Sequence, residues 1–246
     1  MEKQNLMKAI EMRRSRRKFQ GTPIEEAAVI KLTTLIAQYN EVGEVRMELI
    51  TNNGKSFNGF TKSYGMFSGV NDYVVLVAHE QDFDEIERLG YYGEQVVLHA
   101  TALGLGSCWV GGGFSRSDMP ITLPDEASVM GAIIIGNVEV ALSFKERMIH
   151  GMTHRKTKTI EQMYTSNEPV PEWFLTGMQS VQRAPSAVNK QPVMFTYEAG
   201  KVKASLKAPI STWTALDLGI AKLHFELGAG GGTWTWGNHG EFTLQR

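Results

Sequence analysis

The sequence is poor in cysteine and in net charge. Cys108 is the one cysteine among 246 residues. This excludes an intrachain disulfide framework and a metal site built from several thiolates, and it favours a reducing, cytoplasmic setting. The formal net charge is −1, from 25 basic and 26 acidic residues. Overall charge therefore gives no reason to expect nucleic acid or an anionic membrane as the main partner.

Long apolar runs are missing as well. The longest, residues 129–135, is far shorter than the roughly 20 residues that cross a bilayer. Residues 1–19 lack the apolar core of a signal peptide. The six histidines show no metal-ligand spacing, and there is no His-Glu-x-x-His or Cys-x-x-Cys motif. We therefore expect a soluble protein without a metal and without a membrane partner.

Helix and strand patterns are mixed along the whole chain without regular βαβ alternation, which predicts an α+β fold. Helices are expected at residues 3–13, 23–38, 84–103, 171–183 and 215–227, with a short helical pattern at 160–164. Strands are expected at residues 46–51, 72–79, 129–138, 193–197, 201–206, 233–236 and 242–244. For the second helix, we predict a capping box formed by Thr22 and Glu25, with Ile30 and Leu35 buried.

Two segments suit an anionic or planar ligand. Residues 13–18 place several guanidinium groups and a hydroxyl after a helix, which favours phosphate binding. The alternative is a solvated basic surface. Residues 104–114 contain five glycines, which let a backbone approach a ligand closely or simply form a connection from helix to strand. Their spacing matches neither a Rossmann fingerprint nor a P-loop.

Two further segments carry polar groups on loops. Residues 183–192 offer Ser186 and Asn189 between two prolines, which could bind the polar edge of a heteroaromatic ring or form an ordinary helix-ending turn. Residues 154–158 are basic and could bind phosphate or be a solvated loop. Cys108 has no adjacent base and is expected to be a small buried side chain. His99 and His224 are expected in the core or at an interface.

The length suggests about 1.6 domains of ordinary size. A shift of 147 residues aligns residues 24–51 with 171–198 without gaps, each with a helix, a loop and a strand. Any two such units look alike, so chance is the alternative. We interpret the chain as two unequal repeats, residues 1–165 and 166–246, that form one compact unit with a pseudo-twofold axis.

Together these segments resemble the FMN-dependent nitroreductases. The family motif R-R-S-x-R-x-F resembles residues 13–19, and A-P-S-x-x-N-x-Q-P resembles residues 184–192 at every fixed position. The motif L-G-L-G-S-C-W-I-G-G-F resembles residues 103–114 with one extra glycine, and a late basic element resembles residues 156–158. The resemblance implies a nitroreductase-like α+β fold with a mixed, mainly antiparallel sheet flanked by helices.

The order of the motifs differs from the typical order. Typical members are homodimers in which the A-P-S motif follows soon after R-R-S and completes the partner's site. Here the corresponding residues 37–40 lack Pro and Ser, whereas the second repeat lacks the arginine motif. The complementary losses imply a dimer fused into one chain, which keeps one FMN site of two and functions as a monomer.

The resemblance implies an FMN site without a catalytic side chain. Its residues would be Arg13, Arg14, Ser15, Arg17, Trp109, Val110, Gly111, Gly112, Arg155, Lys156, Lys158, Pro185, Ser186 and Asn189. The basic residues and Ser15 would hold the phosphate and the polar side of the flavin. Residues 109–112 would lie near N5, and the A-P-S loop would close the site. Arg17 would stabilise the anionic reduced flavin.

The implied activity is a ping-pong reaction. NAD(P)H would deliver a hydride to flavin N5 and leave, and a small planar acceptor such as a nitroaromatic or a quinone would then be reduced in the same pocket. Two alternatives stay open. The protein could be a non-catalytic flavin-binding protein, or a structural or interaction module in which both flavin sites have decayed.

Overall fold

The structure is a computed structural model that describes residues 3–57, 65–143, 146–148 and 157–245. The chain forms two compact units. We call the one made of Met12–Glu80 and Gln95–Met152 the β1–β4 unit. The β5–β9 unit comprises Met1–Glu11, Gln81–Glu94 and Thr153–Arg246. Both units therefore contain part of helix α4 (Phe83–Ala102).

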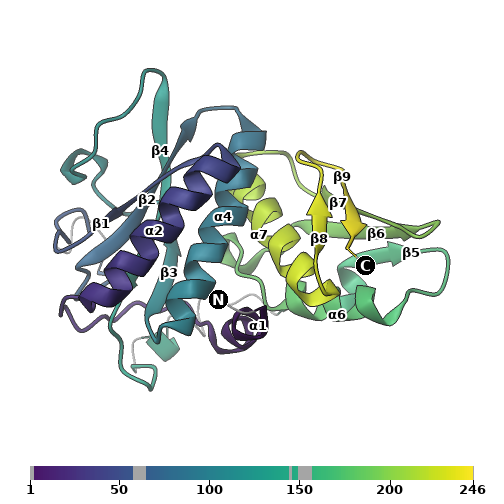
Figure 1. Cartoon of the computed structure of the whole chain (residues 1–246), viewed down its shortest axis with the longest axis horizontal. Coiled ribbons are helices and arrows are strands. Elements are labelled where there is room, and N and C mark those ends of the chain that lie inside the picture. Colours follow the sequence, from purple (N-terminus) through teal and green to yellow (C-terminus); the bar gives the residue numbers. More distant parts are fainter. Residues whose placement is uncertain (1–2, 58–64, 144–145, 149–156, 246) are drawn as a thin grey trace. The chain divides into compact units, whose positions relative to one another are not determined.

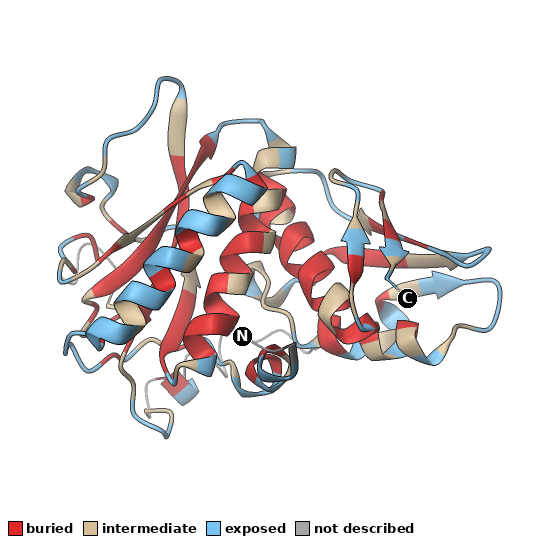
Figure 2. Ribbon diagram, viewed as in Figure 1, coloured by how far each residue is buried: buried red, intermediate tan, exposed pale blue. Residues whose placement is uncertain are grey.

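The β1–β4 unit contains one antiparallel sheet. Its strands are β1 (Arg46–Ile50), β2 (Asp72–His79), β4 (Ala127–Gly136) and β3 (Gly106–Val110), in that spatial order. Strand β2 is buried along its length except at its last residue, as expected for an unbroken apolar run in a central strand. Helix α2 (Glu26–Gly43) packs against β1 (Figure 1). Figure 2 shows the resulting buried layer along β2 and β4.

The β5–β9 unit contains a second sheet. Its strands are β5 (Tyr164–Ser166), β6 (Val193–Glu198), β7 (Lys201–Leu206), β9 (Gly240–Leu244) and β8 (Gly232–Trp234), in that order. Strand β5 is parallel to β6, and the other pairs are antiparallel. Helices α6 (Glu172–Gln182) and α7 (Thr212–Ala229) pack on each other. The core is aromatic: the rings of Phe195 and Phe225 stack at 5.0 Å.

The remaining elements are short or terminal. They are α1 (Lys3–Met12) and the 3₁₀ helices η1 (Arg116–Asp118), η2 (Ile160–Gln162) and η3 (Ala187–Asn189). Among the helices of the described residues, none combines the length and the apolar character needed to cross a bilayer.

The two sheets share one connectivity. In chain order, α2, β1, β2, α4, β3 and β4 correspond to α6, β6, β7, α7, β8 and β9. The sheet orders β1-β2-β4-β3 and β6-β7-β9-β8 then agree strand for strand, with β5 as an addition. This agreement supports the interpretation as two repeats. The predicted boundary between residues 165 and 166 stays a prediction.

Within the β5–β9 unit, helices α4 and α7 touch through their backbones at two glycines. A Cβ atom on Gly90 would lie 2.2 Å from the carbonyl oxygen of Leu216, and one on Gly219 would lie 1.9 Å from that of Glu87. Each glycine thus contacts the residue three positions before the other glycine. A twofold axis between two equivalent helices produces this reciprocal pattern.

Buried polar pairs join the same two helices. Lys222 of α7 donates a hydrogen bond to the carboxylate of Glu87. It also donates to the carbonyl oxygens of Thr235 and Gly237, which both lie 3.0 Å from its Nζ atom. Burial raises the pKa of Glu87 and lowers the pKa of Lys222, and the contact between them opposes both shifts. Removing one partner would leave a buried charge without compensation.

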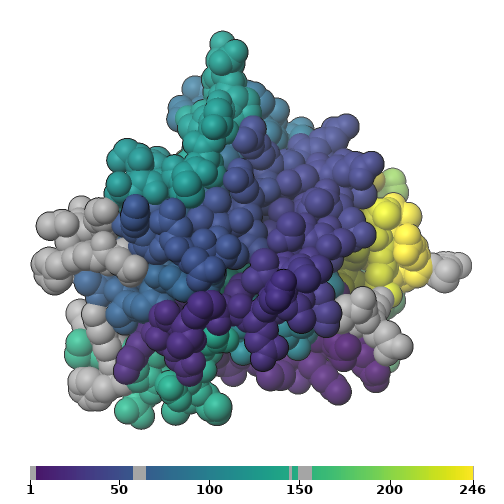
Figure 3. Space-filling view, turned by 60° about the vertical axis from the view of Figure 1, so that its left-hand side comes forward, coloured from purple at the N-terminus to yellow at the C-terminus, as the bar shows by residue number. Residues whose placement is uncertain are grey.

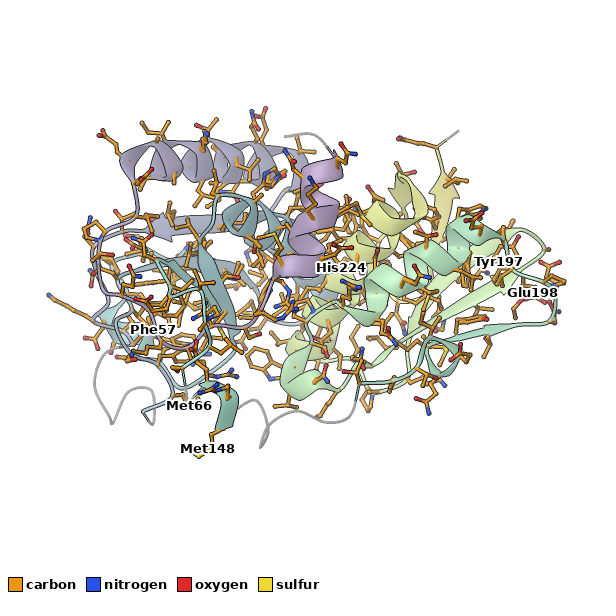
Figure 4. All side chains as sticks on the ribbon, turned by 90° about the horizontal axis from the view of Figure 1, so that it is seen from below. Phe57, Met66, Met148, Tyr197, Glu198 and His224 are labelled. Atoms are coloured by element: carbon orange, nitrogen blue, oxygen red, sulfur yellow. The ribbon has the colours of Figure 1, made fainter. Side chains whose placement is uncertain are left out.

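His224, labelled in Figure 4, has no exposed surface. Its Nε2 atom lies 3.0 Å from Glu94 Oε1, and its Nδ1 atom lies 3.0 Å from the carbonyl oxygen of Ser180. In the β1–β4 unit, His99 is buried and its Nε2 lies 3.2 Å from the hydroxyl of Tyr39. The prediction that both histidines lie in the core or at an interface is confirmed, because both are buried.

The structure corrects the predicted start of helix α2. The helix begins at Glu26 rather than Pro23, and Glu25 precedes it without a side-chain cap. The predicted capping box is therefore wrong, because Thr22 Oγ1 instead accepts a hydrogen bond from Asn137. Ile30, predicted to be buried, is 59% exposed. The buried face is instead formed by Leu32 and Ile36, which lie four residues apart.

Two strands were missed. Residues 104–114 were expected to be a connection, but β3 occupies Gly106–Val110 and pairs with β4. Its glycine is required by packing, because a Cβ on Gly106 would lie 2.4 Å from Val138 Cγ1. Strand β5 lies where a short helical pattern was expected to end. Both strands depend on a neighbouring strand, which local sequence does not reveal.

Candidate functional site

The predicted arginine segment lies beside strand β3. Helix α1 ends at Met12, and Ser15 then forms a parallel bridge with Ser107. The N–H of Arg16 donates to the carbonyl oxygen of Ser107 at 2.8 Å. Arg13 and Arg17 both act on the thiol of Cys108, which shows that their charges lie near this strand. The structure thus brings the predicted arginines together with β3, which carries Trp109 and Val110.

Arg16 differs in role from its neighbours. Its guanidinium is buried, donating through Nε to Glu146 Oε1 at 3.0 Å and through Nη1 to the carbonyl oxygen of Glu139 at 2.7 Å. Glu146 also accepts from the N–H groups of Arg17 and Lys18. Burial alone would raise the pKa of Glu146, but these bonds lower it to about 2. Arg16 and Glu146 therefore fix the segment, and Arg16 is neutralised.

Arg17, the next residue, carries its positive charge near strand β3. Its side chain is half-buried, and its Nε atom is buried without a hydrogen-bond acceptor among the described residues. A buried donor that lacks an acceptor is unfavourable by roughly 1–3 kcal/mol. An anionic or carbonyl-bearing ligand beside β3 would supply that acceptor.

The glycines after β3 leave room beside the strand. Gly112 is exposed, and a Cβ atom placed there would meet no atom within 4 Å. Gly111 and Trp109 are half-buried. The backbone at residues 111–112 is therefore open to a flat ligand. Cys108 is buried and burial raises the pKa of its thiol, which confirms the prediction that it is a small buried side chain.

The A-P-S loop, residues 184–192, lies in the β5–β9 unit between α6 and β6. Ser186 Oγ accepts a hydrogen bond from the N–H of Gln191 at 2.9 Å. The N–H of Ala187 donates to both carboxylate oxygens of Asp217 on α7, at 3.0 and 3.2 Å. Pro185 and Asn189 are half-buried. The loop is thus an ordered structure that presents polar side chains.

Lys158 lies outside this loop in the sequence but contacts its last residues through Gln191. Its Nζ atom donates to the carbonyl oxygen of Gln191 at 2.6 Å, and its N–H donates to the side chain of Gln191 at 2.9 Å. Burial, followed by the charge of Lys207, lowers the pKa of Lys158. The structure therefore joins Lys158 to the A-P-S loop, while Arg155 and Lys156 lie outside the described residues.

The predicted site residues thus form two groups. Arg13, Arg14, Ser15, Arg17, Trp109, Val110, Gly111 and Gly112 belong to the β1–β4 unit. Lys158, Pro185, Ser186 and Asn189 belong to the β5–β9 unit. Each group is brought together within its own unit.

Sequence reasoning missed two carboxylates that hold these groups in place. Glu146 lies about 130 residues from the arginines that it binds, and nothing in its local sequence marks it. Asp217 did leave a signal, because it is an acidic residue among the apolar residues Leu216, Leu218 and Ile220 in a mostly buried helix. An acid in such a position needs a hydrogen-bond donor, and here the donor is the A-P-S loop.

A surface cavity of about 260 Å³ lies elsewhere in the β1–β4 unit. It is lined by Glu80, Arg116, Met119, Ile121, Leu123, Ser128 and Val129. The loop before β4 stands out at the top of Figure 3. No predicted site residue lines this cavity. Among the described residues there is no cluster of three or more His, Cys, Asp or Glu side chains that could hold a metal ion.

Comparison with known proteins gives one family. The family model described as "Putative TM nitroreductase" matches residues 5–229. The fold is similar to that of a solved structure described as a putative nitroreductase from Thermotoga maritima, with a TM-score of 0.63 and 23% identity. The alignment covers 98% of this chain and 94% of that chain. This likeness confirms the predicted nitroreductase-like α+β fold.

Two further solved structures align with part of the chain. An FMN-dependent nitroreductase from Clostridium difficile has 17% identity and a TM-score of 0.43, over 62% of this chain and 99% of that chain. A nitroreductase with bound FMN from Bacteroides fragilis has 18% identity and a TM-score of 0.42, over 57% of this chain and 92% of that chain. A search of curated protein sequences found no match.

Proposed function

The chain belongs to the TM nitroreductase family, and on this premise we propose that it binds FMN and uses NAD(P)H to reduce a small planar acceptor, such as a nitroaromatic or a quinone. Membership of a nitroreductase family supports an oxidoreductase activity. The observation that carries the proposal for FMN is Arg17, whose buried Nε atom has no acceptor among the described residues. It lies in a segment that follows the family motif at every fixed position.

The residues present fit FMN in three respects. The positive charges of Arg13 and Arg17 lie near β3, which suits a phosphate and the electron-rich edge of a flavin. The space next to Gly112 would admit a flat ring. The A-P-S loop presents Ser186 and Asn189, which suit the polar edge of a heteroaromatic ring.

When bound, FMN would supply two-electron transfer at its N5 atom. In this proposal Arg13 and Arg14 bind the phosphate, together with Lys158 and with Arg155 and Lys156 of the basic segment. Arg17 places a fixed positive charge where negative charge develops on reduction. Arg16 is left out of the site because Glu146 neutralises it. No side chain of the chain is assigned proton transfer or nucleophilic attack.

We assign one FMN site to each chain. Helix α2 is preceded by the arginine segment, whereas its counterpart α6 is preceded by described residues 160–170 without an arginine. The A-P-S sequence precedes β6 but not its counterpart β1. One set of arginines and one A-P-S loop suffice for one flavin.

The test is the purified full-length chain with FMN. We expect a yellow protein whose bound flavin is bleached by NADH or NADPH in an anaerobic stopped-flow experiment and recoloured by a nitroaromatic or a quinone. Arg17→Ala should weaken FMN binding at least tenfold, since a charge-assisted contact is lost. Lys31→Ala, which removes an exposed positive charge from α2, should leave the affinity within twofold.

Each outcome has a clear meaning. Bound FMN that neither nicotinamide reduces would favour a non-catalytic flavin-binding protein. A colourless protein that takes up no added FMN would overturn the flavin assignment. Equal FMN affinity of Arg17→Ala and Lys31→Ala would remove Arg17 from the site.

A further inference from the structure

The A-P-S loop is held at its middle by a residue of another element. The N–H of Ala187 points at the carboxylate of Asp217, and both oxygens accept from it, at 3.0 and 3.2 Å. Asp217 is 5% exposed and lies in the second turn of α7. Ala187 stands directly between Ser186 and Val188. A substitution of Asp217 would therefore change the conformation of the neighbouring loop residues that the proposed function assigns to the flavin.

The loop also has a conformation that its own residues disfavour. Val188, Asn189 and Gln191 have φ angles of 46°, 52° and 46°. This left-handed region is unfavourable for residues other than glycine, above all for β-branched valine. Such backbone persists only where the surroundings enforce it, and it occurs preferentially at functional sites. The hydrogen bond that Asp217 accepts from Ala187 and the one that Lys158 donates to Gln191 are parts of that enforcement.

Apart from Asp217 itself, the residues that line the cavity beside it are uncharged. This cavity is lined by Met163, by Val181 of α6 and Val193 of β6, and by uncharged residues of the loop. Lys190, in the loop, is a charged group that acts on Asp217. Burial raises the pKa of Asp217 to about 7, although the N–H of Ala187 and the charge of Lys190 oppose the shift. The carboxyl group therefore changes charge near neutral pH.

This placement disfavours a purely structural role. A carboxyl whose pKa is raised by folding keeps its proton longer in the folded chain than in the unfolded chain. Its contribution to stability therefore falls as the pH rises from about 4 to about 7. An uncharged side chain of the same size would not weaken the fold in this way. The carboxylate therefore occupies a position where its charge is unfavourable for the fold, and its contact there is the A-P-S loop.

We propose that Asp217 is a positioning residue of the flavin site: its carboxylate holds the N–H of Ala187, and thereby keeps Ser186 and Asn189 in the conformation that binds FMN. This inference rests on the proposed function. Loss of a proton from Asp217 strengthens the hydrogen bond, because a charged acceptor binds an amide more tightly than a neutral one. FMN affinity should therefore increase as the pH rises through neutrality.

The hydrogen bond can be observed without FMN. The dipeptide Ser-Ala occurs once in the sequence, at residues 186–187. Labelling serine with ¹³C at the carbonyl and alanine with ¹⁵N therefore selects the Ala187 amide in a carbonyl-edited NMR spectrum. We expect its proton shift to titrate with a midpoint near pH 7 in the wild-type chain and to stay constant in Asp217→Asn.

The positioning role is tested through FMN affinity at different pH values. For the wild type, we expect the Kd for FMN to rise about fivefold between pH 8 and pH 6 beyond the change seen in Asp217→Asn. The phosphate of FMN also titrates near pH 6, but it contributes equally to both proteins. Asp125→Asn, an exposed acid in the other unit, should keep the wild-type profile.

The outcomes separate the inference from the proposed function. If FMN binds but the wild type and Asp217→Asn share one pH profile, the positioning role of Asp217 is wrong and the flavin assignment stands. The same holds if the wild-type Ala187 amide shows no titration near pH 7. If the chain binds no FMN at any pH, the proposed function fails, and with it the role given to the loop, whatever the amide does.

Discussion

Arg16 and Arg17 are adjacent and chemically identical, yet the fold gives them different roles. Arg16 turns inward to Glu146 and stabilises the segment. Arg17 keeps its Nε atom without an acceptor among the described residues, which makes it the better candidate for a ligand contact. The family motif R-R-S-x-R-x-F already distinguishes them, because Arg17 stands at a fixed position and Arg16 at a variable one. Glu146, far away in the sequence, gives the physical reason, because it binds the guanidinium of Arg16.

We expect Glu146→Gln to be less stable than the wild type by roughly 2 kcal/mol at pH 7. The pKa of Glu146 is lowered from 4.5 to about 2 on folding, so its ionised form stabilises the folded chain above pH 4.5. This contribution is lost as the pH falls from 4.5 towards 2, and the two proteins should converge there. Urea unfolding at several pH values measures the difference.

The control is Glu41→Gln, which changes an exposed carboxylate on α2. It should follow the wild type at every pH. A gap between Glu146→Gln and the wild type that stays constant down to pH 3 would contradict the role of ionised Glu146.

At the scale of elements, the sequence predicted those helices and strands whose own residues carry a clear pattern. Strand β2 was predicted with the observed bounds, and the hairpin of β6 and β7 was predicted around Gly200, whose φ is 73°. Strands β3 and β5 were missed because their short sequences, with glycine, serine and threonine, do not indicate a strand without knowledge of the partner strand. Likewise, the motifs identified the loop at residues 184–192, but not the helix that holds it.

Because α4 and α7 are in close backbone contact, we expect one added methyl group between them to reduce the stability of the fold. Gly219→Ala would place its Cβ atom 1.9 Å from the carbonyl oxygen of Glu87, a backbone atom that cannot rotate away. We expect a loss of about 3 kcal/mol in stability, measured by chemical unfolding without FMN. Gly112→Ala, whose Cβ atom would meet nothing within 4 Å, should unfold like the wild type. Equal stability of both variants would refute this helix contact.

At the scale of the molecule, two observations support the fused-dimer interpretation. The two sheets have the same strand order, and Gly90 and Gly219 make reciprocal contacts. Neither rests on the motifs of the proposed site, so they are independent of the family resemblance. In this interpretation, the two diverged halves of one chain take the place of the two identical chains of a homodimer.

This interpretation predicts one FMN for each chain in a monomeric protein. Titration of the apoprotein followed by absorbance should saturate at a ratio of one, and sedimentation should give a mass near 27.3 kDa with and without FMN. A ratio of two would contradict the loss of the second site. An obligate dimer formed on FMN binding would show that the second half does not replace a partner chain.

The interleaving of the two units has a consequence for biosynthesis. All residues of the β1–β4 unit have been made once residue 152 is added, whereas the β5–β9 unit combines Met1–Glu11 with Thr153–Arg246. At ribosomal rates of about 5–20 residues per second, the first helix waits on the order of ten seconds for the strands of its own unit. The nascent chain would thus finish its units in the reverse of the order in which it started them.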